Sequence, residues 1–244
     1  MIRGLKNFIK NLPFVGPFFL FLFGLYRLNS RVSYLEKRIQ NHRWYAVEQV
    51  MDYLVGAQVD GDYCEFGVFK GETFAYGLKF HALFPNMRYF AFDSFEGLPA
   101  PKGIDALDGC TSNFSPGEFA FSENDFLNHL KNLRLPTDRV RTVKGWFNET
   151  LNDDTANRLG INKVAAAWID CDLYESTVPV LSFLTNRISV GTILIFDDWY
   201  VYRNLPDRGE QRACKEWLEK NPNIQIKPIF GYAHHGQVFT VIKV

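Results

Sequence analysis

"YCEFGVFKGETF" (Tyr63–Phe74) passes from an apolar run through a turn with two glycines, Gly67 and Gly71, into a helix-forming segment. Glycine tolerates positive φ angles and lets the backbone approach a ligand where a side chain would obstruct it. A strand that leads through such a turn into a helix is the repeating unit of a parallel α/β sheet. The glycines alone are weak evidence for a ligand, because they also serve as tight-turn residues.

The chain continues this alternation of short β-rich runs and amphipathic segments. The predicted strands are 63–68, 88–93, 140–144, 165–170 and 192–197. The predicted helices are 72–83, 148–159, 176–188 and 210–220. Near the C-terminus, "IQIKPIFG" and "QVFTVIKV" flank "YAHHG", which indicates a β-hairpin. We therefore predict an α/β fold with a doubly wound, mostly parallel seven-stranded sheet, a terminal antiparallel hairpin and an N-terminal helical arm.

Residues 1–59 form the expected arm. An apolar stripe with helical 4-3-4 spacing lies within it, at Leu28, Val32, Leu35 and Ile39. A second helix is expected over residues 42–57. The stripe favours a helix that joins two copies of the chain, so we expect a homo-oligomer.

"LPFVGPFFLFLFGLY" (Leu12–Tyr26) is strongly apolar, but it is shorter than the roughly 20 residues that cross a bilayer, and it contains prolines. Basic residues flank it and no A-x-A cleavage pattern follows, which disfavours a secretory signal. Two alternatives stay open for residues 12–26: peripheral contact with a membrane surface, or burial against a partner subunit.

Residues 60–244 form the expected catalytic domain. Within it, residues 98–138 are rich in Pro, Gly, Ser and Asn and separate the second predicted strand from the third. This segment is too long for a plain connection and predicts a lid or substrate loop.

The composition excludes some classes of function. Lys plus Arg and Asp plus Glu both number 27, so no overall field attracts nucleic acid. A content of 47% hydrophobic and 16% aromatic residues is typical of a globular protein. The four cysteines form no CxxC pair, which argues against a zinc site or a disulfide framework and favours a reducing cytoplasm.

Two acids near the glycine turn indicate the kind of ligand. Asp93 follows Gly71 by 22 residues, at the place where an acid accepts hydrogen bonds from ribose hydroxyls. Glu65 precedes Gly67 by two residues, where it would repel a pyrophosphate but attract a positively charged ligand. The amino and sulfonium groups of S-adenosylmethionine meet that demand better than NAD does.

Carboxylates follow two further strands, in "WIDCDLYEST" (168–177) and "IFDDW" (195–199). Ligands bind outside the carboxyl ends of the strands in a doubly wound sheet, so Asp170, Asp197 and Asp198 should meet if the two strands are neighbours. Consecutive acids point to opposite faces of a strand, so the chain must leave the sheet at Asp197. Clustered carboxylates without Cys or His favour Mg²⁺.

These acids also fit other roles, either in the local structure or in a different class of protein. Asp172 suits the N-cap of the following helix, and either Asp197 or Asp198 suits a turn. Asp170-Cys171-Asp172 is also the D-x-D pattern of metal-dependent glycosyltransferases, and the apolar arm allows a non-catalytic interaction protein on the same scaffold. Ligand binding separates these functions: a methyltransferase binds S-adenosylmethionine, a glycosyltransferase binds a nucleotide sugar, and an interaction protein binds neither.

"EFGVFKGETF", "FAFDSFEGLP", "VKGWFNETL", "IDCDLYEST" and "ILIFDDW" together resemble the macrocin O-methyltransferase family, from about residue 60 to residue 199. Members of this family use S-adenosylmethionine and Mg²⁺ to methylate sugar hydroxyls in antibiotic and related pathways. The resemblance implies a methyltransferase of class EC 2.1.1 with a small hydroxylated acceptor, such as a sugar, and a sheet with a final antiparallel strand.

The resemblance also implies roles for individual residues. The loop from Glu65 to Thr73 would hold the methionine part of the cofactor. The implied cofactor-binding residues are Glu65, Gly67, Val68, Gly71, Thr73, Asp93, Ser94, Gly145, Trp146 and Asp170. Asp93 and Ser94 would bind the ribose, and Gly145 and Trp146 would lie near the adenine. The implied metal ligands are Asp170, Asp197 and Asp198.

The general base is a separate question. Related catechol-type enzymes place a lysine three residues after the metal-binding aspartate, whereas this chain has Leu173, which argues against a catechol acceptor. His234 and His235, in the turn of the predicted hairpin, are the histidines expected near the site. Their usual pKa near ~6.5 suits a general base, although both also suit surface loop residues.

Overall fold

The structure is a computed structural model that describes residues 31–106 and 114–244, with side chains from residue 34 onward. The chain divides into two compact units, Met1–His42 and Arg43–Val244. The apolar stretch 12–26, and with it the expected membrane contact, lies outside the described residues. Among the described residues, no helix combines the length and the hydropathy that crossing a bilayer requires.

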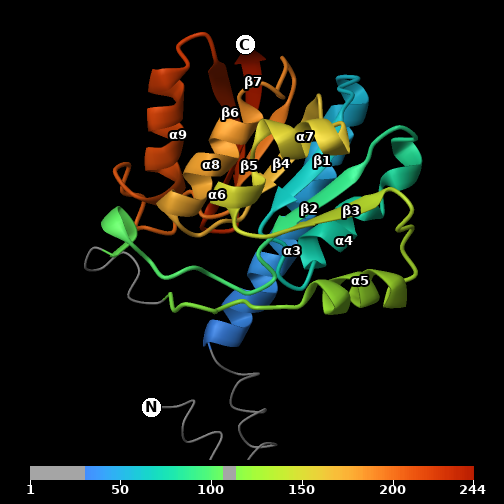
Figure 1. The fold of residues 1–244 in the computed structure, drawn as a ribbon, viewed down its shortest axis with the longest axis horizontal. Coiled ribbons are helices and arrows are strands. Elements are labelled where there is room, and N and C mark those ends of the chain that lie inside the picture. Colours follow the sequence, from blue (N-terminus) through green and yellow to red (C-terminus); the bar gives the residue numbers. More distant parts are fainter. Residues whose placement is uncertain (1–30, 107–113) are drawn as a thin grey trace, which may run out of the picture. The chain divides into compact units, whose positions relative to one another are not determined.

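The second unit is built on a seven-stranded sheet with the order β3-β2-β1-β4-β5-β7-β6 (Figure 1). The strands are β1 (Asp62–Phe66), β2 (Tyr89–Asp93), β3 (Val140–Lys144), β4 (Val164–Ile169), β5 (Ile193–Phe196), β6 (Gln225–Tyr232) and β7 (Gly236–Lys243). Strands β1 to β5 pair in parallel, whereas β7 pairs antiparallel with β5 and β6. The predicted fold class and the terminal hairpin are confirmed.

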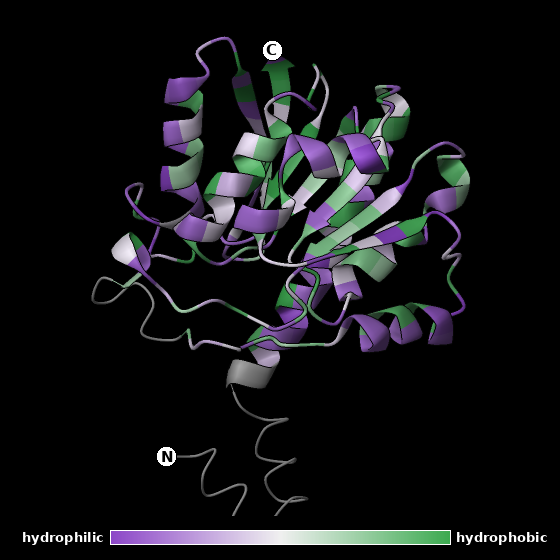
Figure 2. Ribbon diagram, viewed as in Figure 1, coloured by the Kyte–Doolittle hydropathy of each residue, from purple (hydrophilic) through white to green (hydrophobic). Residues whose placement is uncertain are grey.

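Helices cover both faces of this sheet (Figure 1). They are the second part of α3 (Arg31–Gly56), α4 (Glu72–Leu78), α5 (Glu123–Asn132), α6 (Phe147–Thr150), α7 (Asp153–Leu159), α8 (Tyr174–Leu184) and α9 (Gly209–Lys220). Tyr89 and Ala91 of β2 belong to the core with α3, α4 and α5, whereas Phe90 and Phe92 belong to the core with α7, α8 and α9. This alternation explains why the central strands β4 and β5 are hydrophobic and buried along their whole length. Figure 2 shows that other strands also carry hydrophilic residues.

Two helices that the sequence analysis expected before the domain form one helix. Val32, Leu35 and Ile39 of the stripe and residues 42–56 of the second predicted helix are all part of α3, which runs without a break from Arg31 to Gly56, while Leu28 lies outside the described residues. The residues between them, Gln40 and Asn41, include no glycine or proline that would end a helix.

The opposite error occurs after β3, where one predicted helix, 148–159, is divided into α6 and α7. Asn152 is extended, and its side chain accepts a hydrogen bond from the Thr155 amide at 2.9 Å. Such a contact caps a helix start, so it begins a new helix inside the predicted one. The predicted helix 72–83 also ends early, at Leu78, and a 3₁₀ turn, η1 (His81–Leu83), follows it.

The segment 98–138 contains structure that the sequence analysis missed. A 3₁₀ turn, η2 (Gly103–Ala106), lies in its first part, and α5 lies in its second part. Phe126 and Leu130 of α5 are fully buried in the core. The second part of the segment therefore belongs to the body of the domain, while a lid function for the first part stays a prediction.

The glycine turn of the opening stretch is held closely on two sides. Gly67 has φ +86°, and a Cβ atom there would overlap the carbonyl oxygen of Asp170. Gly71 has φ +79°, and a Cβ atom there would lie 2.6 Å from the ring of Phe126. Both positions therefore need glycine for conformation and for space.

A Gly71→Ala variant should be destabilised by more than about 1 kcal/mol, because alanine is strained at positive φ and would also displace Phe126. Gly56→Ala is the matched control: Gly56 is a helical residue with nothing within 4 Å of a built Cβ, so alanine should stabilise it by up to about 1 kcal/mol. Urea unfolding of both variants measures the difference. Equal changes in the free energy of unfolding for the two variants would contradict the close packing of Gly71 against Phe126.

Candidate active site

A cavity of about 590 Å³ lies where strands β1 to β4 end. Ligands bind at this edge of doubly wound sheets, and the volume is within the roughly 300–1,000 Å³ of small-molecule sites. Six of the residues predicted to bind the cofactor line it: Gly67, Asp93, Ser94, Gly145, Trp146 and Asp170. The structure therefore brings these six together at one edge of the sheet.

Asp93 organises the cavity on the side of β2. Its Oδ2 atom accepts hydrogen bonds from the backbone amides of Val68 at 2.7 Å and Phe69 at 3.2 Å, and its Oδ1 accepts one from the Phe95 amide at 2.7 Å. Burial raises the pKa of Asp93, while these amides oppose the rise. Asp93 thus joins the glycine loop to the end of β2.

The other predicted cofactor residues do not line the cavity. They are Glu65, Val68, Gly71 and Thr73, and all four are buried. The carboxylate of Glu65 accepts a hydrogen bond from the Tyr63 hydroxyl at 2.7 Å, and burial raises its pKa to about 8. In this conformation Glu65 lies beneath the loop and does not offer a charge to the cavity.

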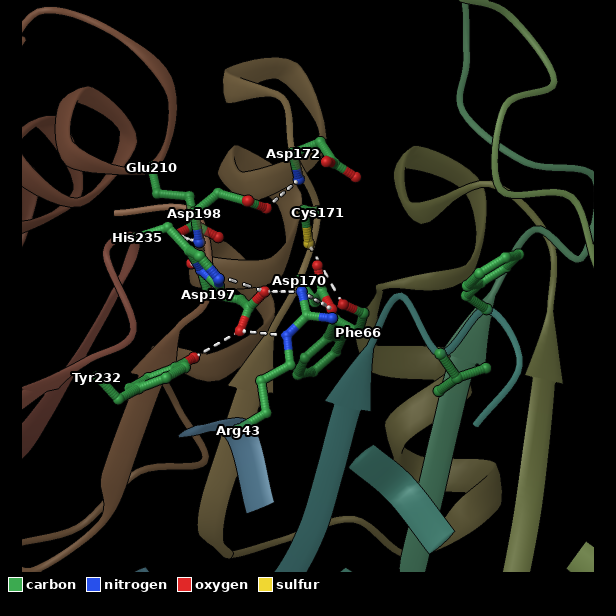
Figure 3. A network of polar contacts seen from close by, with 12 residues as sticks. Arg43, Phe66, Asp170, Cys171, Asp172, Asp197, Asp198, Glu210, Tyr232 and His235 are labelled. Carbon is green, nitrogen blue, oxygen red and sulfur yellow. Dashed lines mark hydrogen bonds and ion pairs between the residues drawn. The ribbon is translucent and has the colours of Figure 1, made fainter. Parts of the chain in front are cut away.

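The predicted acids lie at the tips of β4 and β5 (Figure 3). These strands are neighbours, with Ile169 paired to Phe196, and β5 ends at Phe196. Asp197 therefore lies outside the sheet, as the sequence analysis required. The close-up shows Asp170, Asp197 and Asp198 gathered around one region.

Arg43, from α3, lies between two of these acids. Its Nε donates to Asp197 Oδ1 at 3.0 Å, and its Nη2 pairs closely with Asp197 Oδ2. The same Nη2 lies 3.4 Å from Asp170 Oδ2. Asp197 Oδ1 also accepts a hydrogen bond from the Tyr232 hydroxyl at 2.7 Å. Arg43 and Tyr232 together therefore satisfy the fully buried carboxylate of Asp197.

Asp172 is a fourth acid that lines the cavity. It has φ +58°, which Asp tolerates better than most residues, and its backbone is held on both sides. Its amide donates to Asp198 Oδ2 at 3.1 Å, and its carbonyl oxygen accepts from the Tyr202 hydroxyl at 2.5 Å.

The predicted capping role of Asp172 is wrong. Helix α8 begins at Tyr174, and the carboxylate of Asp105 in η2 accepts the amides of Tyr174 and Glu175, both at 3.0 Å. These bonds satisfy the start of the helix from a segment 69 residues earlier in the chain. The side chain of Asp172 is therefore not used as a cap.

Glu210, at the start of α9, is a fifth acid of this group. Its Oε2 accepts the Asp198 amide at 2.9 Å, and its Oε1 has no hydrogen-bond partner among the described residues. The side chain is fully buried. Burial and the neighbouring negative charges raise its pKa well above the usual value.

The pKa values of the remaining acids are shifted in opposite directions. Burial raises the pKa of Asp198 to about 7, with a contribution from the charge of Asp197. Burial and repulsion likewise raise the pKa of Asp170 and of Asp172. Burial is the largest single effect on Asp197 and would raise its pKa, but the charge of Arg43, the interaction with His235 and the hydrogen bonds from Arg43 and Tyr232 together leave this pKa lowered. The cluster therefore holds more carboxyl groups than its described cation balances, and the excess groups favour their protonated form.

These residues fit a hard divalent cation, which prefers carboxylate oxygens. Ligand atoms of Asp170, Asp172 and Asp198 lie within 4.8 Å of one another, and so do those of Asp197, Asp198 and His235. The first group combines Asp170 and Asp198, two of the predicted ligands, with Asp172. Asp197, the third predicted ligand, lies nearby and is bound to Arg43. The metal role of Asp170, Asp197 and Asp198 stays a prediction.

The two predicted histidines occupy different environments, and neither lines the cavity. His235 is buried, and its Nδ1 lies 2.5 Å from the backbone oxygen of Asp197. His234 is exposed at the turn between β6 and β7, and burial of part of its ring lowers its pKa. The structure thus places His235 against Asp197, while the ring of His234 packs on that of His235.

Arg43 was missed although the sequence carries a signal for it. Arg43, Val47, Val50 and Leu54 share one helical stripe, and the last three are buried. An arginine in register with a buried apolar stripe needs an acidic partner in the interior. Its partners, 127 and 154 residues later, cannot be read from this pattern.

Comparisons with known proteins agree on one family. The family model described as macrocin-O-methyltransferase (TylF) matches residues 35–221. A demethyldecarbamoylnovobiocin O-methyltransferase of Streptomyces niveus is 32% identical over 73% of this chain and 66% of its own length. An 8-demethyl-8-(2,3-dimethoxy-alpha-L-rhamnosyl)-tetracenomycin-C 4'-O-methyltransferase of Streptomyces olivaceus is 32% identical over 68% of this chain. The chain spans 61% of the length of the latter.

Solved structures show the same fold. The O-methyltransferase NovP superposes with a TM-score of 0.68 at 26% identity, over 83% of this chain and 80% of that chain. The calicheamicin methyltransferase CalS11 superposes with a TM-score of 0.64 at 20% identity, over 98% of this chain and 90% of that chain.

The raised pKa of Asp198 predicts a pH-dependent stability. An unfolded aspartate titrates near ~3.9, so between that pH and about 7 the folded protein binds more protons than the unfolded chain. The contribution of Asp198 to stability is therefore present at low pH and is lost as the pH rises through about 7.

Without divalent ions, Asp198→Asn should raise the melting temperature by ~2–4 °C at pH 8 relative to the wild type, with a smaller gain at pH 5. Asparagine keeps an oxygen that accepts the Asp172 amide. Thermal unfolding followed by circular dichroism measures the shift, with the exposed Asp52→Asn as the control. A difference that does not grow with pH would refute this account of Asp198.

Proposed function

Because the chain belongs to the macrocin O-methyltransferase family, we propose that it transfers a methyl group from S-adenosylmethionine to a hydroxyl of a sugar or a glycosylated small molecule. The proposed class is EC 2.1.1. The name of the Streptomyces olivaceus relative describes a rhamnosyl compound methylated at the 4' position, which supports a sugar acceptor. The family match also disfavours the glycosyltransferase alternative and the non-catalytic one.

One observation carries the proposal: a single cavity is bounded by the Asp93-supported glycine loop on one side and by Asp170 and Asp172 on the other. The first side offers open backbone and an acceptor for ribose hydroxyls, which a nucleoside cofactor needs. The second side offers carboxylates at the place where an acceptor hydroxyl would react. A transferase must place both reactants in contact, since proximity and orientation supply much of the catalysis.

We place the cofactor along β1 to β3. Gly67 gives open backbone at the end of β1, Asp93 and Ser94 offer oxygens to ribose hydroxyls, and Gly145 with Trp146 borders the far side. S-adenosylmethionine, once bound, supplies an electrophilic methyl group on its sulfonium. The strand tips would hold that group toward the acids.

The acids would orient and deprotonate the acceptor. Mg²⁺ held by Asp170 and Asp198, with Asp172 or Asp197 as the third acid, would supply positive charge that acidifies a hydroxyl. Asp172 is the better base than His234 or His235, because it lines the cavity and its raised pKa makes it more basic than an ordinary aspartate. His235 would act on Asp197, whose backbone oxygen it contacts.

Cofactor binding tests the first half of the proposal. Wild-type protein should bind S-adenosylhomocysteine in calorimetry. Asp93→Asn should raise the dissociation constant by about tenfold, because a hydrogen bond to a charged acceptor contributes ~1.5–3 kcal/mol. Asp52→Asn should bind as the wild type does. Absence of binding by the wild type would refute the cofactor assignment.

Methyl transfer tests the second half. With labelled S-adenosylmethionine and a panel of glycosides and phenols, we expect label on glycosides, loss of transfer after chelation and recovery with Mg²⁺. Asp170→Asn should lower the rate by at least about 100-fold, since it removes a charged ligand group while the side chain keeps its size. Transfer that persists under chelation would exclude the metal role, and label on phenols alone would exclude the sugar acceptor.

A further inference from the structure

Arg43 is an unusual neighbour for acids that fit a divalent cation. Its guanidinium bonds Asp197 with both Nε and Nη2, and Nη2 lies 3.4 Å from Asp170, so one side chain bridges the tips of β4 and β5 (Figure 3). About a quarter of the side chain is exposed, and it lines the cavity.

The position of this guanidinium is fixed by its helix. Val47 and Val50, one and two turns after Arg43 on α3, are buried in the core against the sheet. A helix anchored in this way presents the arginine at one place, so the positive charge is a permanent part of the cluster. Tyr232, which shares Asp197 with Arg43, is itself buried and packs against Trp168.

The charges of the cluster are unequal. Five carboxylates lie together: Asp170, Asp172, Asp197, Asp198 and Glu210. In the part of the chain that the structure describes, Arg43 is the one arginine or lysine within ion-pair distance of any of them. A divalent ion beside Asp170 would therefore meet a positive charge that already lies 3.4 Å from the same carboxylate, and like charges at such distances repel strongly.

We infer that Arg43 is a resident counter-ion that competes with the divalent cation for the acids at the tips of β4 and β5. The inference rests on the proposed metal site and adds to it. The guanidinium keeps the cluster stable without a metal, and it lowers the affinity for the metal. In the metal-free protein Asp197 is paired with Arg43, and a divalent ion can bind the Asp197 carboxylate only by displacing the guanidinium.

The test uses the full chain and three variants. Arg43→Met removes the charge and keeps much of the length of the side chain. Arg88→Met is the matched control, because Arg88 pairs with Asp62 through Nε at 2.9 Å and Nη2 at 2.5 Å in the same two-pronged manner, at the amino ends of β1 and β2. Arg43→Lys keeps a charge that cannot form both bonds to Asp197.

Two readouts do not depend on catalysis: the dissociation constant for Mn²⁺ by calorimetry, and the melting temperature with and without Mg²⁺. Arg43→Met should bind Mn²⁺ at least tenfold more tightly than the wild type. Without metal its melting temperature should fall by at least about 6 °C, because a buried carboxylate loses its partner, and Mg²⁺ should restore most of this loss. Arg88→Met should lose stability that Mg²⁺ does not restore, with wild-type affinity for Mn²⁺.

The outcomes separate this inference from the proposed function. Wild-type binding of Mn²⁺ reports on the proposed metal site, and the ratio between Arg43→Met and the wild type reports on Arg43. A ratio below twofold, or a loss of melting temperature that Mg²⁺ leaves unchanged, overturns the role of Arg43 even if the wild type binds metal. If Arg43→Met does not fold, Arg43→Lys decides: threefold tighter binding of Mn²⁺ supports the inference, and unchanged or weaker binding overturns it.

Discussion

The ion pair of Arg43 with Asp197 is the interaction on which the rest of the site depends. A carboxylate that is fully removed from water is costly unless a charge and hydrogen bonds compensate it, and Arg43 with Tyr232 supplies both. Because the partners come from α3, β6 and the end of β5, this one cluster ties the helix before the sheet to the hairpin that closes it. The acids at the strand tips can then be concentrated without unfolding the edge of the sheet.

The sequence predicted the parts of the molecule that local patterns determine. Alternating β-rich and amphipathic segments indicated the sheet and its terminal hairpin, and all five parallel strands lie within one or two residues of their predicted bounds. The acids after β4 and β5 were located because parallel strands end at the same edge of a sheet. The end of β5 at Phe196 follows from the same reasoning, since two consecutive acids can share a site only outside the pleat.

Contacts between distant segments escaped prediction. Arg43 meets Asp197 across 154 residues, and Asp105 reaches the start of α8 across 69. No spacing rule connects such positions, so a capping role was left open for Asp172 although Asp105 accepts the first amides of α8. Glu210 was overlooked for a related reason: an acid in the first turn of a helix is ordinarily explained by the helix dipole, and only the fold shows that it supports the Asp198 amide.

The carboxylate of Asp105 has a consequence for engineering. The connection between β2 and α5 is a long surface segment, and such segments tolerate changes more readily than the elements that they join. Here that connection carries the group that completes the first turn of α8, and α8 follows the acids after a single residue, Leu173. A chimera that imports a foreign connection without an acid at this place would leave the first amides of α8 without their acceptor, directly beside the clustered acids, and the resulting disorder of the acids would be mistaken for an effect of the new connection itself.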